Sequence, residues 1–364
     1  MISELGIMDF KCFRDVKLPL AALTVLSGYN GAGKSSALQP LLLAAQSSRL
    51  GPWDSPSSLE MPLNGSLVRL GTVGDVLPPD ATDIRFQFVT SDASLTLYAS
   101  AKAGERSLMR KGFDSDGAWG DLFASLGQLV YLSAVREGAI EAFPAPDRLG
   151  DDLQDVAMDG RFASFWYHRL ADNEVEPARR CPDEPADTFR KQVDAWLGRL
   201  APGARANVVP VPAASAYALQ FKLTETGEWR RPANVGYGLT YAFPIIVALL
   251  AAKPGAVVVI DSPEAHLHPR AQSHMGKMLA TFASAGVQVI VETHSDHVLN
   301  GVRIAVRDKV IDHDQTSLLF FSGISDAGHG VTTPRLDREG RIDEWPDGFF
   351  DQSEKDVAQL AGWA

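Results

Sequence analysis

The chain has 364 residues, 45% of them hydrophobic, which is enough for one large or two ordinary domains with a packed core. Its formal net charge of -11 argues against a surface that is basic throughout, so nucleic acid would have to bind at a local patch or through a partner. The two cysteines, Cys12 and Cys181, lack ligand-like spacing, which argues against a disulfide framework and favours a reducing, cytoplasmic compartment.

The N-terminal part of the sequence predicts two strands, a glycine-rich loop and a helix. The strands are expected at residues 2–13 and 23–27, and the helix at 34–48. Residues 51–79 are rich in Pro, Gly and Ser, so they are expected to form a surface loop. Alternating or continuous hydrophobic residues predict three further strands, at 84–88, 94–98 and 128–133.

The middle of the chain shifts to charged and small residues bounded by prolines, which predicts a helical insertion over residues 141–205. Helical patterning within this insertion is found around 162–170 and 188–200. A hairpin is expected to follow at 216–224, with its turn at Thr226 and Gly227.

The C-terminal part alternates strands with helices, which is typical of a mainly parallel sheet covered by helices. The apolar run at 241–252 is shorter than the roughly 20 residues that a membrane span needs, so it predicts a core helix and no membrane association. The expected elements are strands at 256–260 and 287–291, helices at 235–250, 270–283 and 296–306, and a short amphipathic helix from about Ser353.

The loop between the second strand and the first helix matches the phosphate-binding pattern, with Gly28, four intervening residues, and then Gly33, Lys34 and Ser35. Its glycines let backbone N–H groups converge on phosphate oxygens, and the helix N-terminus adds partial positive charge. Lys34 is expected to reach the terminal phosphates and assist catalysis, and Ser35 to ligate Mg²⁺. The alternative is a glycine-rich turn that merely enters a helix. The predicted nucleotide-binding residues are Asn30, Gly31, Ala32, Gly33, Lys34, Ser35 and Ser36.

Two carboxylates follow the apolar strand that ends at Asp261. Because ligands bind at the carboxyl ends of parallel strands, Asp261 is expected to hold Mg²⁺ together with Ser35; an acid that only caps the next turn is the alternative. Glu264 is close enough in sequence to orient or deprotonate an attacking water, which makes it the predicted catalytic carboxylate. A helix-capping glutamate is the alternative for this residue.

The next strand ends in Thr293, His294, Ser295 and Asp296. His294 is the predicted catalytic histidine, expected to hydrogen-bond the terminal phosphate, whereas its neighbours could simply cap the following helix. His266, His268, His294 and His297 also fit a zinc site, but the phosphate motifs account for the same residues without a second metal.

In this order the motifs resemble those of ABC-like P-loop ATPases of the SMC and OLD group. They most closely resemble bacterial AAA-family ATPases with a C-terminal domain of unknown function, which are found in anti-phage defence systems. DFKCF at 9–13 is similar to the group's opening strand, YLSA-x-R at 131–136 to its central segment, and VGYGLT at 235–240 to its signature motif. IDSPEAHLHP at 260–269 is similar to its Walker B with D-loop, THSD at 293–296 to its switch histidine, and GRIDEWPDGFFD at 340–351 to its C-terminal segment.

The resemblance implies an α/β fold: an ABC-ATPase-like head with a mainly parallel sheet core, an antiparallel β subdomain and a helical insertion. Its expected segments are an N-terminal half at 1–140, the insertion at 141–205 and a C-terminal half at 206–364. The resemblance also implies ATP and Mg²⁺ as cofactors and a head-to-tail homodimer or higher oligomer. In such a dimer, ATP on one subunit's phosphate loop faces Gly236 and Gly238 of the other, although Gly-Tyr-Gly alone is equally typical of a bulge or turn.

Three positions depart from the group's pattern or leave its roles open. Ser262 stands where transporter-like ATPases have a catalytic glutamate, and a hydroxyl is too weakly basic for that task, so either Glu264 substitutes or turnover is slow. Gln46 either senses Mg²⁺ or is only an exposed residue at a helix end. The Toprim domain of OLD nucleases is rich in metal-binding acids, whereas the roughly 70 residues after THSD hold no such cluster, which predicts no nuclease site.

Two functions follow from these motifs. The first is an ATP-driven dimerisation switch that controls a separate effector protein in anti-phage defence. The alternative is a DNA-binding repair or chromosome-maintenance ATPase that uses basic residues of the insertion. Acids interleave with those residues, which favours a solvated mixed-charge surface. The basic residues are Arg161, Arg169, Arg179, Arg180, Arg190 and Lys191.

Overall fold

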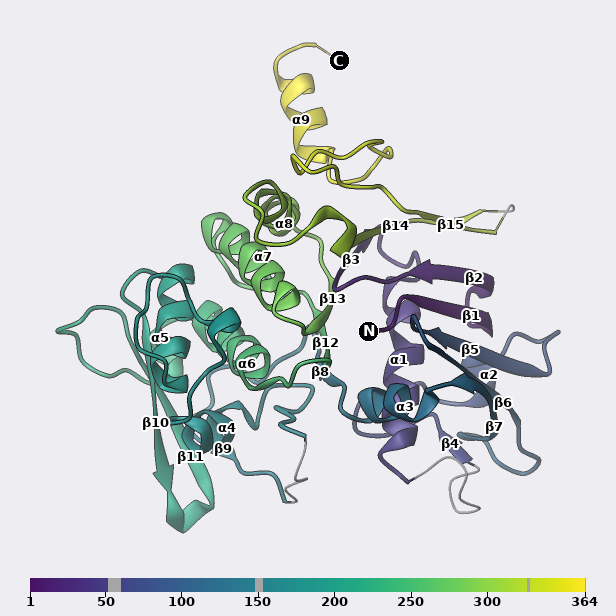
Figure 1. Ribbon diagram of the computed structural model, residues 1–364, viewed down its shortest axis with the longest axis horizontal. Coiled ribbons are helices and arrows are strands. Elements are labelled where there is room, and N and C mark those ends of the chain that lie inside the picture. Colours follow the sequence, from purple (N-terminus) through teal and green to yellow (C-terminus); the bar gives the residue numbers. More distant parts are fainter. Residues whose placement is uncertain (52–59, 148–152, 326–327, 364) are drawn as a thin grey trace. The chain divides into compact units, whose positions relative to one another are not determined.

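A computed structural model describes residues 1–51, 60–147, 153–325 and 328–363 (Figure 1). The chain divides into two compact units. The first contains Met1–Leu129, Thr316–Asp337 and Ile342–Ala364, and the second contains Val130–Gln315 and Arg338–Arg341. These bounds differ from the segments expected at 1–140, 141–205 and 206–364, which remain predictions.

An antiparallel sheet makes up much of the first unit, as expected. Its strands follow the order β2-β1-β5-β6-β7-β4. The expected single strand at 2–13 is wrong, because the chain turns at Lys11, whose φ is 53°, and returns as a second strand. The strands are β1 (Glu4–Phe10), β2 (Phe13–Pro19), β4 (Glu60–Pro62), β5 (Asp83–Val89), β6 (Ala93–Ala101) and β7 (Leu108–Gly117).

The first unit also holds a parallel pair that leads into the phosphate loop. β3 (Leu23–Gly28) runs parallel to β14 (Thr316–Ser325), which pairs antiparallel with β15 (Gly328–Thr332). The first five residues of β3 are buried, which explains the continuous apolar run in this part of the sequence. The helices of this unit are α1 (Lys34–Ser48), α2 (Val73–Val76), α3 (Trp119–Gly127) and α9 (Gln352–Leu360). Part of the loop expected at 51–79 lies outside the described residues, and its described part contains β4 and α2.

Three parallel strands form the core of the second unit. β12 (Val257–Asp261) lies between β8 (Val130–Leu132) and β13 (Gln288–Glu292), and pairs with both in parallel. The associated helices are α6 (Tyr237–Ala251), α7 (Pro269–Ser284) and α8 (Asp296–Arg307). α7 and α8 cross so closely that a Cβ atom on Gly276 or Gly301 would lie 2.2 Å from a backbone oxygen of the other helix. The expected strands and helices of this region are therefore confirmed, with small shifts at their ends.

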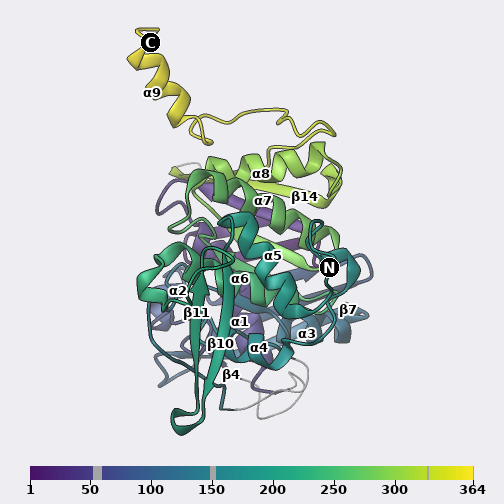
Figure 2. The same ribbon diagram turned by 90° about the vertical axis from the view of Figure 1, so that its left-hand side faces the viewer.

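The expected insertion contains two helices, and a small antiparallel sheet is associated with it. The helices are α4 (Ala163–Leu170) and α5 (Phe189–Leu200), and Figure 2 shows β10 and β11 side by side. The sheet has the order β10-β11-β9. Its strands are β10 (Arg205–Val211), β11 (Ala216–Lys222) and β9 (Phe143–Pro144). The hairpin was expected to turn at Thr226 and Gly227, but its main turn lies at Pro212–Ala214, before β11. The later turn leads only to an isolated bridge between Phe221 and Arg230.

None of the helices in the described ranges combines the length and the hydrophobicity needed to cross a bilayer.

Candidate functional site

Three glycines with positive φ shape the loop between β3 and α1. The φ angles are 139° at Gly28, 75° at Gly31 and 104° at Gly33. A Cβ atom on Gly28 would lie 2.1 Å from the carbonyl oxygen of Phe321, whereas one on Gly31 would meet nothing within 4 Å. Gly28 is therefore required by the packing of β3 on β14, while Gly31 is required by its backbone conformation and leaves open space beside it.

Lys34 lies against the backbone of its own loop. Its side chain is buried, and Nζ donates to the carbonyl oxygens of Gly28, at 3.0 Å, and Tyr29, at 2.9 Å. Gly33 begins α1 without a side-chain cap, so the helix N-terminus presents backbone N–H groups and partial positive charge. Asn30, Gly31 and Ser35 are exposed around this point, while Ala32 is buried. This arrangement suits an anionic ligand.

The C-terminal segment packs on the phosphate loop, a contact that the motifs alone do not indicate. The Tyr29 ring, half of it exposed, meets Phe320 with 5.9 Å between ring centroids. Phe320 in turn contacts Phe349 at 5.4 Å. A Cβ atom on Gly348 would lie 1.9 Å from the Tyr29 hydroxyl, so only glycine permits this approach. The part of the GRIDEWPDGFFD segment that lies in this unit, from Ile342 to Asp351, thus supports the loop.

Ser36 and Gln46 have structural partners inside the first unit. Ser36 hydrogen-bonds the Cys12 thiol, whose pKa is raised by burial and lowered in part by this bond. Gln46 is buried, not exposed at a helix end as the second alternative had it. Its Oε1 accepts from the backbone N–H groups of Leu67, at 3.1 Å, and Val68, at 3.3 Å, and its Nε2 donates to the Pro62 carbonyl at 3.0 Å. Gln46 therefore holds the segment that follows β4.

Asp261 ends β12 in the second unit, and Ser262 turns back onto it. Ser262 has a φ of 51°, and its hydroxyl donates to Oδ1 of Asp261 at 2.8 Å. Its backbone N–H donates to the carbonyl oxygen of Glu292 on β13, also at 2.8 Å. Ser262, which stands where a glutamate was expected, thus holds the Asp261 carboxylate by a hydrogen bond.

Glu264 joins the Walker B turn to the switch segment. Its Oε2 accepts from the Thr293 hydroxyl at 2.7 Å, and its Oε1 accepts from the backbone N–H of His294 at 2.9 Å. The helix-capping alternative for Glu264 is wrong, because the imidazole of His268 caps α7. Both carboxylate oxygens have protein donors, so an attacking water would share them with Thr293 and His294.

The switch segment leaves one imidazole at the surface. His294 is exposed, whereas Thr293 and Ser295 are buried. Ser295 caps α8, with its hydroxyl accepting from the Val298 N–H at 3.1 Å, as the capping alternative expects for one residue of this group. The local fold therefore separates the capping role of Ser295 from His294.

The other histidines of the weighed zinc site have separate surroundings. His266 contacts the rings of Tyr237 and Tyr241, His268 caps α7, and His297 lies 3.8 Å from Asp296. Within the described ranges, no group of three or more His, Cys, Asp or Glu residues is placed to hold a metal ion.

The signature-like glycines begin α6. Gly236 is exposed, has a φ of 85°, and precedes the helix without a side-chain cap. A Cβ atom on Gly236 would meet nothing within 4 Å, but one on Gly238 would lie 2.8 Å from the His266 carbonyl oxygen. Gly236 therefore leaves the helix N-terminus open, and Gly238 allows close packing against the D-loop.

The predicted site residues thus fall into two groups. The phosphate-loop residues lie in the first unit, and Asp261, Glu264, His294, Gly236 and Gly238 lie in the second. The second unit also holds a residue that the motifs did not assign to the site. Arg136 is 3% exposed, and its guanidinium donates to the backbone carbonyls of Asp261 and Ser262. Nothing in the sequence around Arg136 indicates burial, and only its place in the YLSA-x-R segment could have drawn attention to it.

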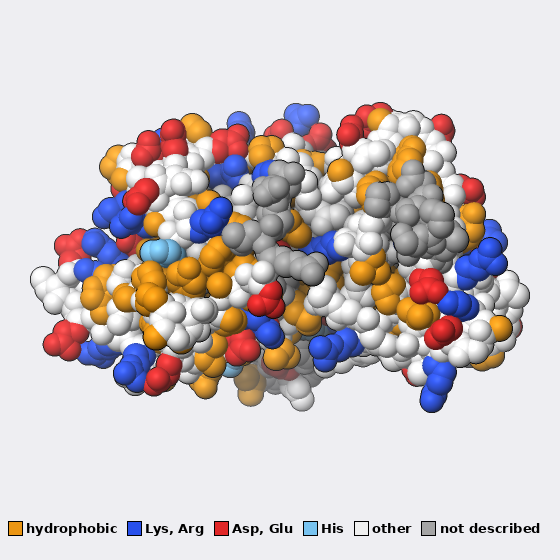
Figure 3. Space-filling view, turned by 90° about the horizontal axis from the view of Figure 1, so that it is seen from below, with side chains coloured by type: hydrophobic (Ala, Val, Ile, Leu, Met, Phe, Trp, Pro, Cys, Tyr) orange, Lys and Arg blue, Asp and Glu red, His pale blue; other side chains and the backbone are white. Residues whose placement is uncertain are grey.

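The basic residues of the insertion are mostly paired with acids or the backbone. Arg180 pairs with Glu174 at 2.7 Å, and Arg190 pairs with Asp172. Arg179 is buried and donates to the Leu250 carbonyl. Figure 3 shows a face on which acidic and basic side chains interleave. These pairs agree with the mixed-charge surface expected from the sequence, and DNA binding stays an untested alternative.

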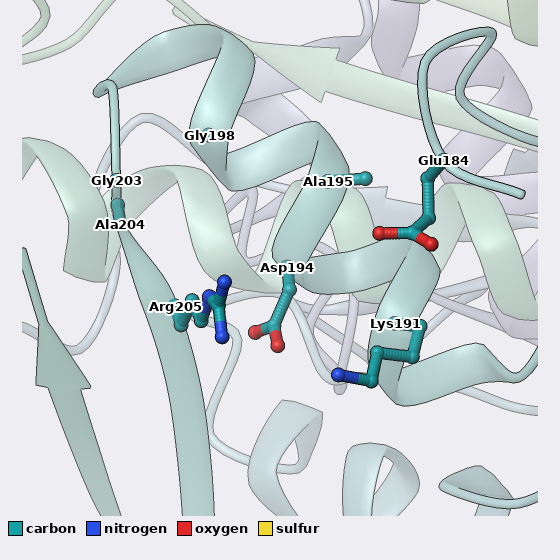
Figure 4. A pocket seen from close by; sticks show the side chains of 8 residues that line it. All are labelled: Glu184, Lys191, Asp194, Ala195, Gly198, Gly203, Ala204 and Arg205. Atoms are coloured by element: carbon teal, nitrogen blue, oxygen red, sulfur yellow. The ribbon is translucent and has the colours of Figure 1, made fainter. Parts of the chain in front are cut away.

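A cavity of about 200 Å³ lies in the insertion, apart from all predicted site residues of the second unit. Figure 4 shows the Asp194 carboxylate between the side chains of Arg205 and Lys191. Oδ1 of Asp194 accepts from the Ala206 N–H at 2.9 Å, and burial raises the pKa of this carboxyl group to about 6. The cavity carries none of the phosphate-binding motifs.

Two family models match the sequence. The family described as "AAA domain, putative AbiEii toxin, Type IV TA system" matches residues 23–300. A second family, described as "Protein of unknown function (DUF3696)", matches residues 311–360. The OLD nuclease of Thermus scotoductus is 25% identical over 331 residues, which cover 81% of this chain and 59% of that protein. This chain therefore spans about three fifths of the length of that relative.

Solved structures of SMC heads share the fold. One, bound to the C-winged helix domain of ScpA, has a TM-score of 0.50 at 14% identity and covers 93% of this chain and 98% of its own. Another, from Pyrococcus furiosus with an extended coiled coil and bound to the C-terminal domain of ScpA, has a TM-score of 0.51 at 12% identity and covers 99% of both chains. At these identities the likeness shows the fold alone. Because the first family spans most of the sequence, the chain belongs to the family described as AAA domain, putative AbiEii toxin, Type IV TA system, and is a P-loop ATPase of the SMC and OLD type.

Proposed function

We propose that the chain binds ATP with Mg²⁺ at residues 28–35, hydrolyses it slowly, and closes with a second copy head to tail when ATP is bound. The observation that carries the proposal is the phosphate loop itself. Lys34 lies on the carbonyls of Gly28 and Tyr29 at the uncapped start of α1. On binding, its ammonium would exchange two neutral carbonyl acceptors for charged phosphate oxygens, which form stronger hydrogen bonds.

The second unit supports the rest of the proposal. We assign Mg²⁺ to Ser35 and Asp261, the terminal phosphate to His294 and the attacking water to Glu264. The open N-terminus of α6, with Gly236 exposed at its start, would receive the nucleotide of a second copy. Each ATP would then be held by two subunits.

Slow turnover makes the paired state last, and this supports a switch that controls a separate effector in the cytoplasm during anti-phage defence. Ser262 bonded to Asp261, and Glu264 bonded to Thr293 and His294, favour persistence over rapid hydrolysis. The nuclease activity named for the OLD relative is no part of this proposal, because the chain spans 59% of that protein.

Subunit complementation tests the proposal. Lys34→Ala and Gly236→Ala proteins should each lose ATP hydrolysis, Lys34→Ala by losing the phosphate contact and Gly236→Ala by disturbing the start of α6. Mixed in equal amounts, random pairing gives half heterodimers, each with one intact composite site, so about a quarter of the wild-type rate should return. Lys17→Ala, at an exposed position on β2, is the control and should behave as wild type.

Sedimentation with and without a non-hydrolysable ATP analogue should show ATP-dependent pairing of the wild type. The proposal fails if Lys34→Ala binds and hydrolyses ATP as well as wild type. Absence of recovery in the mixture, with both variants folded by thermal melting, would instead rule out the composite site.

A further inference from the structure

Arg136 is an expensive group to bury at this place. It follows β8 near the carboxyl end of β12, and its Nη2 atom bridges the carbonyl oxygens of Asp261 and Ser262, the latter at 3.1 Å. Its Nε and Nη1 atoms are buried without a hydrogen-bond partner among the described residues. Burial lowers its pKa to about 10, and the nearby Asp261 and Glu264 carboxylates oppose that shift. A buried cation with unmet donors is costly, so its position calls for a role.

The carbonyls that Arg136 holds belong to a strained turn. Ser262 and His266 have φ angles of 51° and 61°, a conformation that non-glycine residues adopt only with backbone strain. Asp261 stands at the start of this turn. By donating to both of its first two carbonyls, Arg136 fixes the direction in which the Asp261 side chain leaves the strand.

Arg136 also contacts α6. The guanidinium lies over the Tyr241 ring at 5.6 Å, within the range of a cation–π contact. Tyr241 meets the His266 ring edge-on at 4.8 Å, and His266 also contacts Tyr237 at 5.4 Å. The close approach of Gly238 to the His266 carbonyl completes the contact. The first turns of α6 and the turn after Asp261 therefore form one packed cluster.

We propose that Arg136, through Tyr241 and His266, is the positioning residue that couples the start of α6 to Asp261. Under the proposed function, on which this inference rests, a nucleotide or second copy arriving at the α6 N-terminus displaces Tyr237 and Tyr241. That displacement reaches Asp261 through the guanidinium. Pairing then sets the position of the Walker B acid, and hydrolysis responds to pairing.

Three variants, one of them a matched control, test the coupling. Arg136→Lys keeps the charge but cannot bridge two carbonyls and stack on a ring. Tyr241→Leu removes the ring, whereas Tyr241→Phe keeps it and is the matched control. Arg136→Lys and Tyr241→Leu should keep ATP affinity and ATP-dependent pairing, yet lose at least about tenfold in hydrolysis by the pairs; Tyr241→Phe should lose less than about twofold.

Hydrogen exchange of the protein without nucleotide gives a second readout. Backbone amides across 261–267 should exchange about tenfold faster in Arg136→Lys and Tyr241→Leu, and at the wild-type rate in Tyr241→Phe. Unchanged exchange in Arg136→Lys, or loss of ATP affinity together with hydrolysis, overturns the inference. If Arg136→Lys and Tyr241→Leu exchange faster but the wild-type protein neither pairs nor hydrolyses ATP, the positioning role is supported and the proposed function is wrong instead.

Discussion

The phosphate loop of the first unit and the Walker B turn of the second follow their motifs to different degrees. In the loop, the motif glycines have the required φ angles and Lys34 lies over the backbone that would hold the phosphates. In the turn, the acid is present, but Ser262 occupies the next position and bonds to it. Glu264, the nearest substitute base, already accepts hydrogen bonds from two donors.

This difference separates binding from hydrolysis. A phosphate loop acts through backbone groups whose placement is fixed by a short sequence, so it tolerates little change. A general base must instead keep an oxygen available for water and a pKa suited to proton transfer. In the second unit the carboxylate of Glu264 holds Thr293 and the backbone of His294 together. Under the proposed function, the chain therefore retains the features for binding ATP more completely than those for hydrolysing it.

The largest expected effect tests whether the loop depends on its packing or only on its conformation. Gly28→Ala would place a Cβ atom 2.1 Å from the Phe321 carbonyl oxygen, so we expect the free energy of unfolding to fall by about 3 kcal/mol or more. Gly31→Ala meets no atom within 4 Å and should cost only about 1 kcal/mol of backbone strain. Urea unfolding compares the two.

The same pair separates stability from binding. Gly31→Ala projects a methyl group into the open space of the loop, so its ATP affinity, measured by calorimetry, should fall although its fold survives. Equal stability losses in the two variants would show that the contact between Gly28 and Phe321 does not limit the loop.

The second prediction concerns the Walker B turn, which follows its motif less completely than the phosphate loop does. Glu264→Gln keeps the shape, because the amide oxygen can accept from the His294 N–H while the Thr293 hydroxyl reverses to accept from the amide. Loss of the negative charge should lower steady-state ATP hydrolysis by about 100-fold, with ATP affinity unchanged, if Glu264 is the base. Glu225→Gln, on an exposed side chain paired with Arg205, is the control. A wild-type rate in Glu264→Gln would leave Glu264 as a structural link only.

Local patterns predicted most of the fold near the motifs. β3, β12 and β13 are buried almost throughout, so each forms a continuous apolar run that the sequence displays directly. α1 starts and ends where expected, at Lys34 and Ser48, because the glycine loop marks its first residue. The phosphate loop could likewise be predicted in full, since all of its parts lie within eight consecutive residues.

Nonlocal pairing explains what the sequence did not predict. β14 owes its place to β3, a partner almost 300 residues away, and no local alternation marks it. β7 contains Lys111, which interrupts the pattern; burial lowers its pKa to about 8, and its ammonium donates to the Ser47 hydroxyl at 2.7 Å. At the site, Glu264 accepts a hydrogen bond from Thr293, and the buried Arg136 donates to the Asp261 carbonyl. These partners are likewise far apart in sequence.

The smallest expected effect concerns Asp194 in the insertion, outside both the phosphate loop and the Walker B turn. Burial raises the pKa of Asp194 to about 6, so the folded state binds this proton more tightly than the unfolded state, and the stabilisation from Asp194 is lost as pH rises from about 4 through 6. Asp194→Asn keeps the acceptor for the Ala206 N–H and removes the charge. Its advantage over wild type in free energy of unfolding should grow by about 2 kcal/mol between pH 4.5 and 7.5. Asp194→Ala should show the same pH dependence, offset by about 1 kcal/mol for the lost hydrogen bond.

ATP affinity should not change in either variant, because the cavity lies apart from the site residues of the second unit. A constant difference across the pH range would contradict the buried charge, and a change in ATP affinity would show that the insertion communicates with the nucleotide.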